Sequence, residues 1–190
     1  MMKKITEVGP EPQVLTHRSS WVIATGFGSG LLPFAPGTWG SLAALTAWMG
    51  IVILGLLLNL RKPLAVFVFL GPFLLWWIGS GSLKRIQFEL EKKDPPYIVI
   101  DEWVGMWIAL MPLASVIARD PFVSLQEQLL RCALPFCLFR LLDIWKPGPI
   151  GRAQKLGGSS GIMMDDVLAG IATALLTKPS LIVMHQFFID

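Results

Sequence analysis

The stretch SLAALTAWMGIVILGLLL, residues 41–58, contains no charged side chain. An α-helix needs about 20 mostly apolar residues to cross the hydrocarbon core of a bilayer, and about 17 is the lower limit. Inside lipid, a backbone segment must also satisfy its own hydrogen bonds, which a helix does. Residues 41–58 are therefore predicted to form a membrane-spanning helix.

The composition of the whole chain agrees with this prediction. Of its 190 residues, 54% are hydrophobic and only 15% are charged, and the mean hydropathy is +0.62. Such a chain is far more apolar than an ordinary soluble domain and is typical of an integral membrane protein. The sequence has no internal repeat, so we expect a polar lead-in over residues 1–20 and a single membrane-embedded domain over residues 21–190.

Further apolar runs follow the first one. Three of them approach or reach the spanning length, at residues 63–80, 98–118 and 129–145. A shorter run, 162–177, is separated by Lys178 and Pro179 from a final apolar stretch, 180–189. Together the runs predict an all-α fold, a polytopic membrane helical bundle with about four to five spanning or partly inserted helices.

Basic residues divide unequally between the two sides of this bundle. If the amino terminus is cytoplasmic and the spans alternate, ten of them lie on the cytoplasmic side and four on the other. The ten are Lys3, Lys4, Arg18, Lys84, Arg85, Lys92, Lys93, Lys146, Arg152 and Lys155, and the four are Arg61, Lys62, Arg119 and Lys178. The positive-inside rule favours this orientation. Because the bases are scattered rather than gathered in one stripe, the net charge of +3 does not indicate a nucleic-acid partner.

Acidic residues and one lysine gather at the ends of the predicted spans. They are Asp101, Glu102, Asp143, Lys146, Asp165 and Asp166. In the favoured orientation all six lie at the cytoplasmic face, which the loop GFGSGLLPFAPGTWG, residues 26–40, also reaches. Adjacent carboxylates are costly to desolvate and repel each other, so a compensating group is expected. We therefore predict a single site at this face.

The mixture of carboxylates and bases favours a cation and a phosphate. Hard cations such as Mg2+ take oxygen ligands, often one or two carboxylates together with water and substrate phosphate. Such a cation would relieve the repulsion between Asp165 and Asp166. Neighbouring helical residues point about 100° apart, so one of the two is expected to bind metal while the other orients a water or a basic partner. Arg140, Asp143 and Lys146 share a helix face through their three-residue spacing.

The same residues also have purely structural interpretations. Asp101 or Asp165 alone would suit a helix start, where the dipole favours an acidic cap. Arg140 would serve only to neutralise Asp143, and Lys146 would only extend its ammonium group to the membrane surface. The glycines of the loop 26–40 would serve a tight turn. The convergence of the acidic pairs favours the metal and phosphate site.

Three blocks of sequence lie in order and cover most of the chain: TGFGSGLLPFAPGTWGSLAAL (25–45), IDEWVGMWIALM (100–111) and FRLLDIWKPGPIGRAQKLGGSSGIMMDDVLAG (139–170). Together they resemble the phosphatidylglycerophosphatase A family of bacterial membrane lipid phosphatases. The resemblance implies Mg2+-dependent hydrolysis of phosphatidylglycerophosphate, a membrane phospholipid, to phosphatidylglycerol and inorganic phosphate. A bacterial family of this kind also implies a location in the bacterial cytoplasmic (inner) membrane, and the distribution of basic residues predicts that the active site is on the cytoplasmic face.

Carried over residue by residue, the resemblance implies a set of site residues: Asp101, Glu102, Asp143, Lys146, Asp165 and Asp166, with Thr38, Gly26, Gly37 and Gly40 of the first block. Together with Arg140, which its helical spacing brings to the same face, we assign these residues to three roles. The metal ligands would be Asp101, Glu102, Asp165 and Asp166. The catalytic residues would be Asp143, Lys146 and Asp166. The substrate-binding residues would be Gly26, Gly37, Thr38, Arg140 and Lys146. In the mechanism we favour, Asp143 orients or deprotonates the attacking water, while Lys146 and loop amides offset the charge on the phosphoryl group. Trp103 stands where an aliphatic residue or Phe is commoner in the family, which changes packing beside the acids but not the ligands.

Residue types exclude two other phosphatase classes. A cysteine phosphatase needs a Cx5R loop, which neither Cys132 nor Cys137 forms, and both are expected to be reduced core residues. A histidine-based lipid phosphatase needs two His near basic residues, a setting that His17 and His185 lack. A carboxylate-lined ion or phosphate transporter is the alternative function, although it would place its acids near the middle of the membrane.

Overall fold

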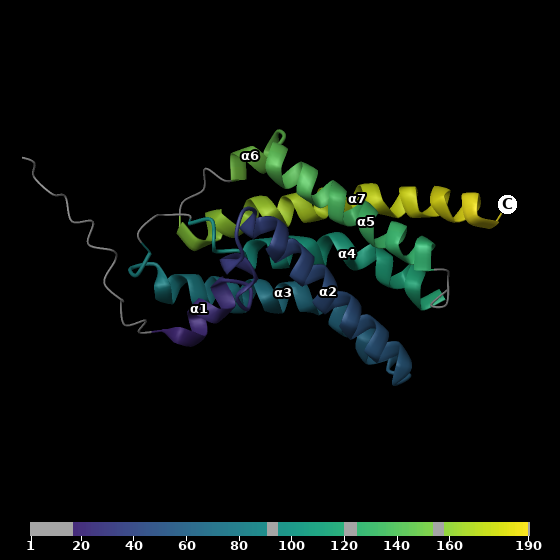
Figure 1. The fold of residues 1–190 in the computed structure, drawn as a ribbon, viewed down its shortest axis with the longest axis horizontal. Helices are drawn as coiled ribbons and strands as arrows, with labels where there is room; N and C mark the ends of the chain where they lie inside the picture. Colours follow the sequence, from purple (N-terminus) through teal and green to yellow (C-terminus); the bar gives the residue numbers. More distant parts are fainter. Residues whose placement is uncertain (1–16, 91–94, 120–124, 154–157, 190) are drawn as a thin grey trace, which may run out of the picture.

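The computed structural model describes residues 17–90, 95–119, 125–153 and 158–189, and within these ranges every regular element is a helix (Figure 1). The elements are α1 (Arg18–Ala24), the 3-10 helix η1 (Ser29–Leu31), α2 (Pro36–Leu57), α3 (Arg61–Ile86), α4 (Ile100–Arg119), α5 (Leu125–Trp145), α6 (Pro149–Ala153) and α7 (Gly158–Ile189). The five long helices form one bundle, and the short helices α1 and α6 lie at the end away from the C-terminus. The predicted all-α fold is confirmed.

Three of the helices are long and apolar enough to cross a membrane. They are Pro36–Leu57, Arg61–Ile86 and Ile100–Ile117. They correspond to the predicted runs 41–58, 63–80 and 98–118. The 22 residues of α2 give a length of about 33 Å at 1.5 Å per residue, which matches a hydrocarbon core of about 30 Å. The protein is a helical membrane protein.

Helix α5 forms where the fourth run is predicted but is not among these three, because it carries several charged residues. Two of them neutralise each other one helical turn apart, since Arg131 Nη2 donates to Glu127 Oε1 at 2.5 Å and both side chains are buried. Cys132 and Cys137 are both free, as predicted. Cys137 is exposed, however, so its predicted place in the core is wrong, because α5 turns that face away from the bundle.

Helix α7 is longer than predicted. It continues without a break from Gly158 to Ile189, so the predicted separation at Lys178 and Pro179 is wrong. A proline inside a helix removes one backbone hydrogen bond, and a bundle in which neighbours satisfy the freed groups tolerates this loss. Prolines also lie inside α3, α4 and α5.

Helix α4 lies at the centre of the bundle and contacts α2, α3, α5 and α7. Its approach to α7 is especially close. A Cβ atom on Gly105 would lie 2.6 Å from the carbonyl oxygen of Asp166, and one on Gly170 would meet the backbone of Gly105. Small residues let membrane helices approach backbone to backbone in this way. The crossing brings the first turn of α4 next to the acidic pair of α7.

Helix α1 and the loop after it pack against the same end of the bundle, and neither α1 nor α6 was predicted from the sequence. Trp21 Nε1 in α1 donates to Glu89 Oε2 at 2.7 Å, just beyond α3. The backbone N–H of Val99 donates to the carbonyl of Ala24 at 3.0 Å. These contacts join the start of the described chain to the segment that leads into α4.

Candidate active site

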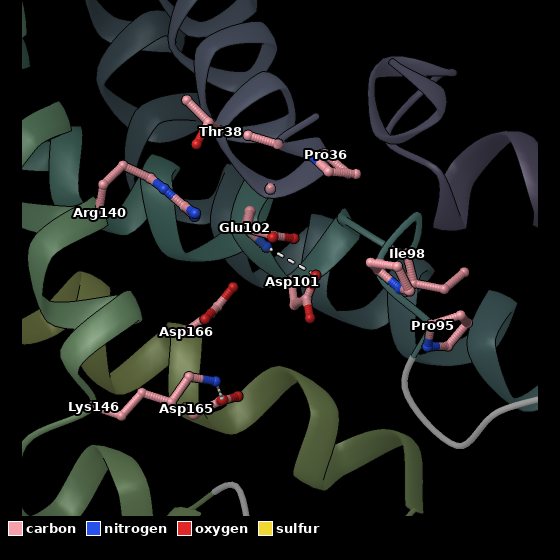
Figure 2. Close-up of a pocket in the computed structure, with 13 residues that line it drawn as sticks. Pro36, Thr38, Pro95, Ile98, Asp101, Glu102, Arg140, Lys146, Asp165 and Asp166 are labelled. Atoms are coloured by element: carbon pink, nitrogen blue, oxygen red, sulfur yellow. Dashed lines mark hydrogen bonds and ion pairs between the residues drawn. The ribbon is translucent and has the colours of Figure 1, made fainter. Parts of the chain in front are cut away.

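A cavity of about 340 Å³ opens at the end of the bundle that carries α1 and α6 (Figure 2). Four parts of the chain line it: the start of α2, the segment before α4 with the first turn of α4, the end of α5, and α7. The lining residues are Ala35, Pro36, Gly37, Thr38, Pro95, Pro96, Ile98, Asp101, Glu102, Arg140, Lys146, Asp165 and Asp166. The prediction of a single site is therefore supported by residues that lie far apart in the sequence.

Three carboxylates form a compact acidic cluster on one wall of the cavity. One oxygen from each of Asp101, Glu102 and Asp166 lies within 4.8 Å of the others. Asp101 and Asp166 are buried, and Glu102 Oε2 is a buried atom without a hydrogen-bond partner in the described part of the chain. Like charges at this spacing repel. An all-oxygen set of this kind can hold a hard divalent cation, which would supply the missing partner.

Asp165 turns from this cluster toward a lysine. Lys146 Nζ donates to Asp165 Oδ2 at 2.5 Å, and Figure 2 shows Asp166 pointing toward α4 while Asp165 faces Lys146. The arrangement matches the expectation that the two aspartates would point in different directions, one of them toward a basic partner. Asp165 lies seven residues after the start of α7, so the capping interpretation of Asp165 is wrong, because a dipole effect is confined to the first turn.

Lys146 lies just beyond α5, in a backbone conformation with φ +48. Residues other than glycine rarely adopt this left-handed region, and doing so costs about 1 kcal/mol or more. Burial lowers the pKa of the Lys146 ammonium group, but the hydrogen bond to Asp165 and the charges of Asp165, Asp143 and Asp166 outweigh it, so the pKa is raised. The lysine therefore stays charged at neutral pH and faces the cavity.

Arg140 both pairs with Asp143 and reaches the cavity. Its Nη1 donates to Asp143 Oδ2 at 2.7 Å and to Ser41 Oγ at 3.3 Å. A Cβ atom on Gly37 would lie 3.2 Å from Arg140 Nη2 and would also meet Glu102 Oε1. Only a glycine at the start of α2 therefore lets the arginine and the acidic cluster approach this closely. Asp143 is buried behind Arg140 and does not line the cavity.

The predicted glycine- and threonine-containing loop divides into two parts. Gly37 and Thr38 lie in the first turn of α2, after Pro36 at the first helical position, and both line the cavity. The first turn of a helix leaves N–H groups without partners and attracts anions. Gly26 does not line the cavity. Its φ is +57 and it packs against Trp103 and Val99, so its position is structural.

Sequence reasoning missed the wall formed before α4. Pro95, Pro96 and Ile98 line the cavity beside Asp101. Their only signal in the sequence is that they immediately precede the acidic pair. Apolar residues of this kind exclude water from one side of the site while leaving the charged groups on the other sides.

The fold and the cavity define a helical membrane protein whose polar site at one end of the bundle suits a divalent cation and an anionic ligand. The chain belongs to the phosphatidylglycerophosphatase A family, since the model of that family matches residues 22–180. Membership of this family makes it a phosphatase.

Curated relatives agree with this assignment. A phosphatidylglycerophosphatase A of Escherichia coli is 36% identical over 154 residues, which cover 80% of this chain and 78% of the relative. A protein of the same name from Haemophilus influenzae is 36% identical over 174 residues, covering 90% and 94% of the two chains. A third relative, from Bacteroides thetaiotaomicron, is 37% identical over 155 residues, covering 82% and 89%, and is named "Putative phosphatidylinositol-3-phosphatase". No solved structure gave a significant match.

Proposed function

We propose that this protein hydrolyses the terminal phosphate of phosphatidylglycerophosphate, producing phosphatidylglycerol and inorganic phosphate. The observation that carries the proposal is the cavity in which an acidic cluster faces a lysine, an arginine and a helix N-terminus. The cavity lies at the end of a bundle with membrane-length helices, where a lipid headgroup would meet it. The names of two relatives indicate the same substrate.

Mg2+ is the cofactor that the acidic cluster fits best. We propose that Asp101, Glu102 and Asp166 hold it, because their oxygens already converge and Glu102 Oε2 has no hydrogen-bond partner in the described chain. When bound, Mg2+ would polarise a phosphoryl oxygen and offset its charge. Asp165, the fourth ligand implied by the sequence, would instead serve mainly to hold Lys146.

The bases and the start of α2 would bind the phosphate. Lys146 and Arg140 line the cavity on the α5 side, and Gly37 and Thr38 present the N-terminus of α2 from another side. Preorganised donors of this kind stabilise the negative charge that grows on a phosphoryl group during transfer. The raised pKa of Lys146 keeps this donor protonated.

The attacking water needs a carboxylate that can orient it. Asp166 reaches the cavity, whereas Asp143 lies beside Asp166 and away from the cavity. We therefore propose that Asp166 orients the water, and that Asp143 positions Arg140 and Asp166 rather than contacting the water itself. Attack of the water oxygen on phosphorus would break the bond to the glycerol oxygen, which takes up a proton and leaves as the lipid alcohol.

The proposed location is the bacterial inner membrane, with the cavity on the cytoplasmic face. The distribution of Lys and Arg along the sequence supports this orientation. The positions of Asp101 and Glu102 in the first turn of α4 place the acids near the end of a span. A transporter would be expected to carry such acids nearer the middle, so the structure favours the enzyme over that alternative.

The test is phosphate release by the purified protein in detergent. The substrates are phosphatidylglycerophosphate, phosphatidic acid and phosphatidylinositol 3-phosphate, each with Mg2+ or with EDTA. The proposal expects release that requires Mg2+ and is fastest with phosphatidylglycerophosphate. Faster release from the inositol lipid, as the name of the Bacteroides relative suggests, would overturn the substrate. Absence of release from every lipid would overturn the enzymatic activity.

A further inference from the structure

The loop between α1 and α2, residues 26–35, has two chemically different faces. One face consists of small residues that pack against the segment leading into α4. Gly26 and Gly30 leave no room for a Cβ atom, because Trp103, Val99 and the carbonyl of Tyr97 lie against them. The hydroxyl of Ser29 accepts a hydrogen bond from Trp103 Nε1 at 3.4 Å. This face is fixed to the first turn of α4, which also carries Asp101 and Glu102.

The other face of the loop is apolar and exposed. Phe27 is 60% exposed, Leu31 68%, Leu32 44% and Phe34 fully exposed. The two phenylalanines have φ values of +56 and +74, a region that residues other than glycine rarely adopt. The ring of Phe27 keeps one side against Trp103, with ring centroids 5.2 Å apart, whereas the ring of Phe34 points outward. Packing does not require the position of the Phe34 ring, because this side chain is fully exposed within the described chain.

The loop directly precedes a helix of membrane-spanning length. Helix α2 begins at Pro36, directly after the loop, and its length matches the hydrocarbon core. Helix α2 also exposes apolar side chains, including Leu42 and Leu54. The basic pair Lys84 and Arg85 lies in the last turn of α3, as expected at the polar boundary of a bilayer. Apolar and aromatic side chains at this depth are stable at the interface between acyl chains and headgroups.

The loop also borders the cavity. Ala35 and Pro36, at its end, line the cavity beside Gly37. An apolar rim next to a phosphate-binding cavity suits a ligand that combines a phosphate with acyl chains. A water-soluble phosphate ester has no acyl chains that could contact the exposed aromatic rings.

We propose that the outer face of the loop, formed by Phe27, Leu31, Leu32 and Phe34, inserts into the headgroup region of the leaflet on the cavity side and forms the rim over which the lipid substrate reaches the cavity. The inner face of the loop contacts Trp103 through Gly26 and Ser29. These contacts fix the position of the loop relative to the first turn of α4. The role in substrate access rests on the proposed function, whereas the insertion itself does not.

The first experiment measures insertion without using activity. Cys132 and Cys137 are replaced by Ala, Phe34→Cys is labelled with an environment-sensitive fluorophore, and the protein is placed in phosphatidylglycerol–phosphatidylethanolamine vesicles. Arg152→Cys, at an exposed position in α6, is the control. The label at position 34 should be quenched by spin-labelled lipid and protected from aqueous iodide, while the label at position 152 should show the reverse. Equal iodide quenching at the two positions, in protein oriented with the cavity outward, would overturn the proposal.

The second experiment measures substrate access. Phe34→Ser should lower kcat/KM for phosphatidylglycerophosphate in vesicles about tenfold, the order expected when one aromatic side chain loses its apolar surroundings. Phe88→Ser is the matched control, because Phe88 is 90% exposed but lies beyond the end of α3, outside the loop that leads to the cavity residues Ala35 and Pro36, and it should keep wild-type kcat/KM. Unchanged thermal stability of both variants in detergent would show that folding is intact. An unchanged kcat/KM in Phe34→Ser would refute the rim. If the wild type releases no phosphate but position 34 is shielded, the proposed function fails and the insertion stands.

Discussion

Replacing Asp166 by Asn should remove most of the activity while leaving the fold intact. Asp166 is only 3% exposed, and one of its oxygens lies within 4.8 Å of those of Asp101 and Glu102. Two unit charges at that separation interact by about 3.5 kcal/mol at an effective dielectric constant of 20. Asn keeps the size of the side chain and removes this repulsion from both neighbours. Without a divalent cation, the variant should therefore be at least as stable as the wild type.

The loss of activity follows from the metal site. If the cluster holds Mg2+, the variant retains two of its three anionic ligands, and a loss of about a hundredfold is at the upper end for a disturbed metal shell. A hundredfold loss corresponds to about 2.7 kcal/mol of transition-state stabilisation. The same change should remove most of the stabilisation that Mg2+ gives to the folded protein.

Two assays on detergent-purified protein test this reasoning. One measures phosphate release at low Mg2+, and the other measures thermal unfolding with and without Mg2+. At a Mg2+ concentration about 100 times its Kd, binding should stabilise the wild type by about 2.7 kcal/mol, which raises Tm by about 5 °C or more for a chain of this size. Asp166→Asn should lose this shift. Asp165→Asn, which changes the partner of Lys146 but not the cluster, should keep it.

One result would refute the reasoning. If Asp166→Asn released phosphate at nearly the wild-type rate at low Mg2+ and showed the same Mg2+-dependent rise in Tm, the acidic cluster would not be a metal site. The cluster would then have to be interpreted as a structural feature of the α4–α7 contact.

Three further predictions concern the lysine, the helix crossing and the orientation. Lys146→Met should lower kcat at least about tenfold, since one charge-stabilising donor is typically worth this much or more. Saturating Mg2+ should not restore kcat in this variant. Restoration by Mg2+ would show that Lys146 acts only on the metal. Gly170→Leu should lower Tm and the yield of folded protein, because a side chain there would meet the backbone of Gly105, whereas Gly50→Leu, where a Cβ meets nothing within 4 Å, should not. Cysteines at Lys84 and Arg152, in a chain lacking Cys132 and Cys137, should resist a membrane-impermeant label added to intact cells, and efficient labelling would reverse the proposed orientation.

The bundle and its spans could be predicted because they depend on apolar length, which a sequence displays directly. The uncharged run 41–58 becomes most of α2, the run 63–80 becomes the central part of α3, and the run 98–118 covers nearly all of α4. The continuity of α7 through Pro179 could not be predicted, because a local rule places a break wherever a proline follows a charged residue. Packing against neighbouring helices decides whether that break occurs, and a single sequence does not show the neighbours.

The types of residue in the site could be predicted from the sequence, but the contacts that each residue makes could not. Periodicity indicated that Asp165 and Asp166 would point in different directions, yet it did not show which of them faces the acids of α4. That choice follows from the crossing at Gly105 and Gly170, a contact between distant parts of the chain. Gly26 and Gly37 belong to the same glycine-rich block, and only tertiary packing separates the one held against Trp103 from the one beside the cavity.

The glycine crossing also explains why the site lies at one end of the bundle rather than in its middle. Asp101 and Glu102 are in the first turn of α4, and the close contact of Gly105 with α7 places Asp166 at the same level. Gly37, in the first turn of α2, meets Glu102 at that level too. Three helices therefore contribute their polar groups at one level, close to the first turns of α2 and α4, which are both long enough to span a membrane. If α2 and α4 span the bilayer, the phosphate of a membrane lipid would lie near this level, so the packing of the two glycines would set the height at which the cavity meets the proposed substrate.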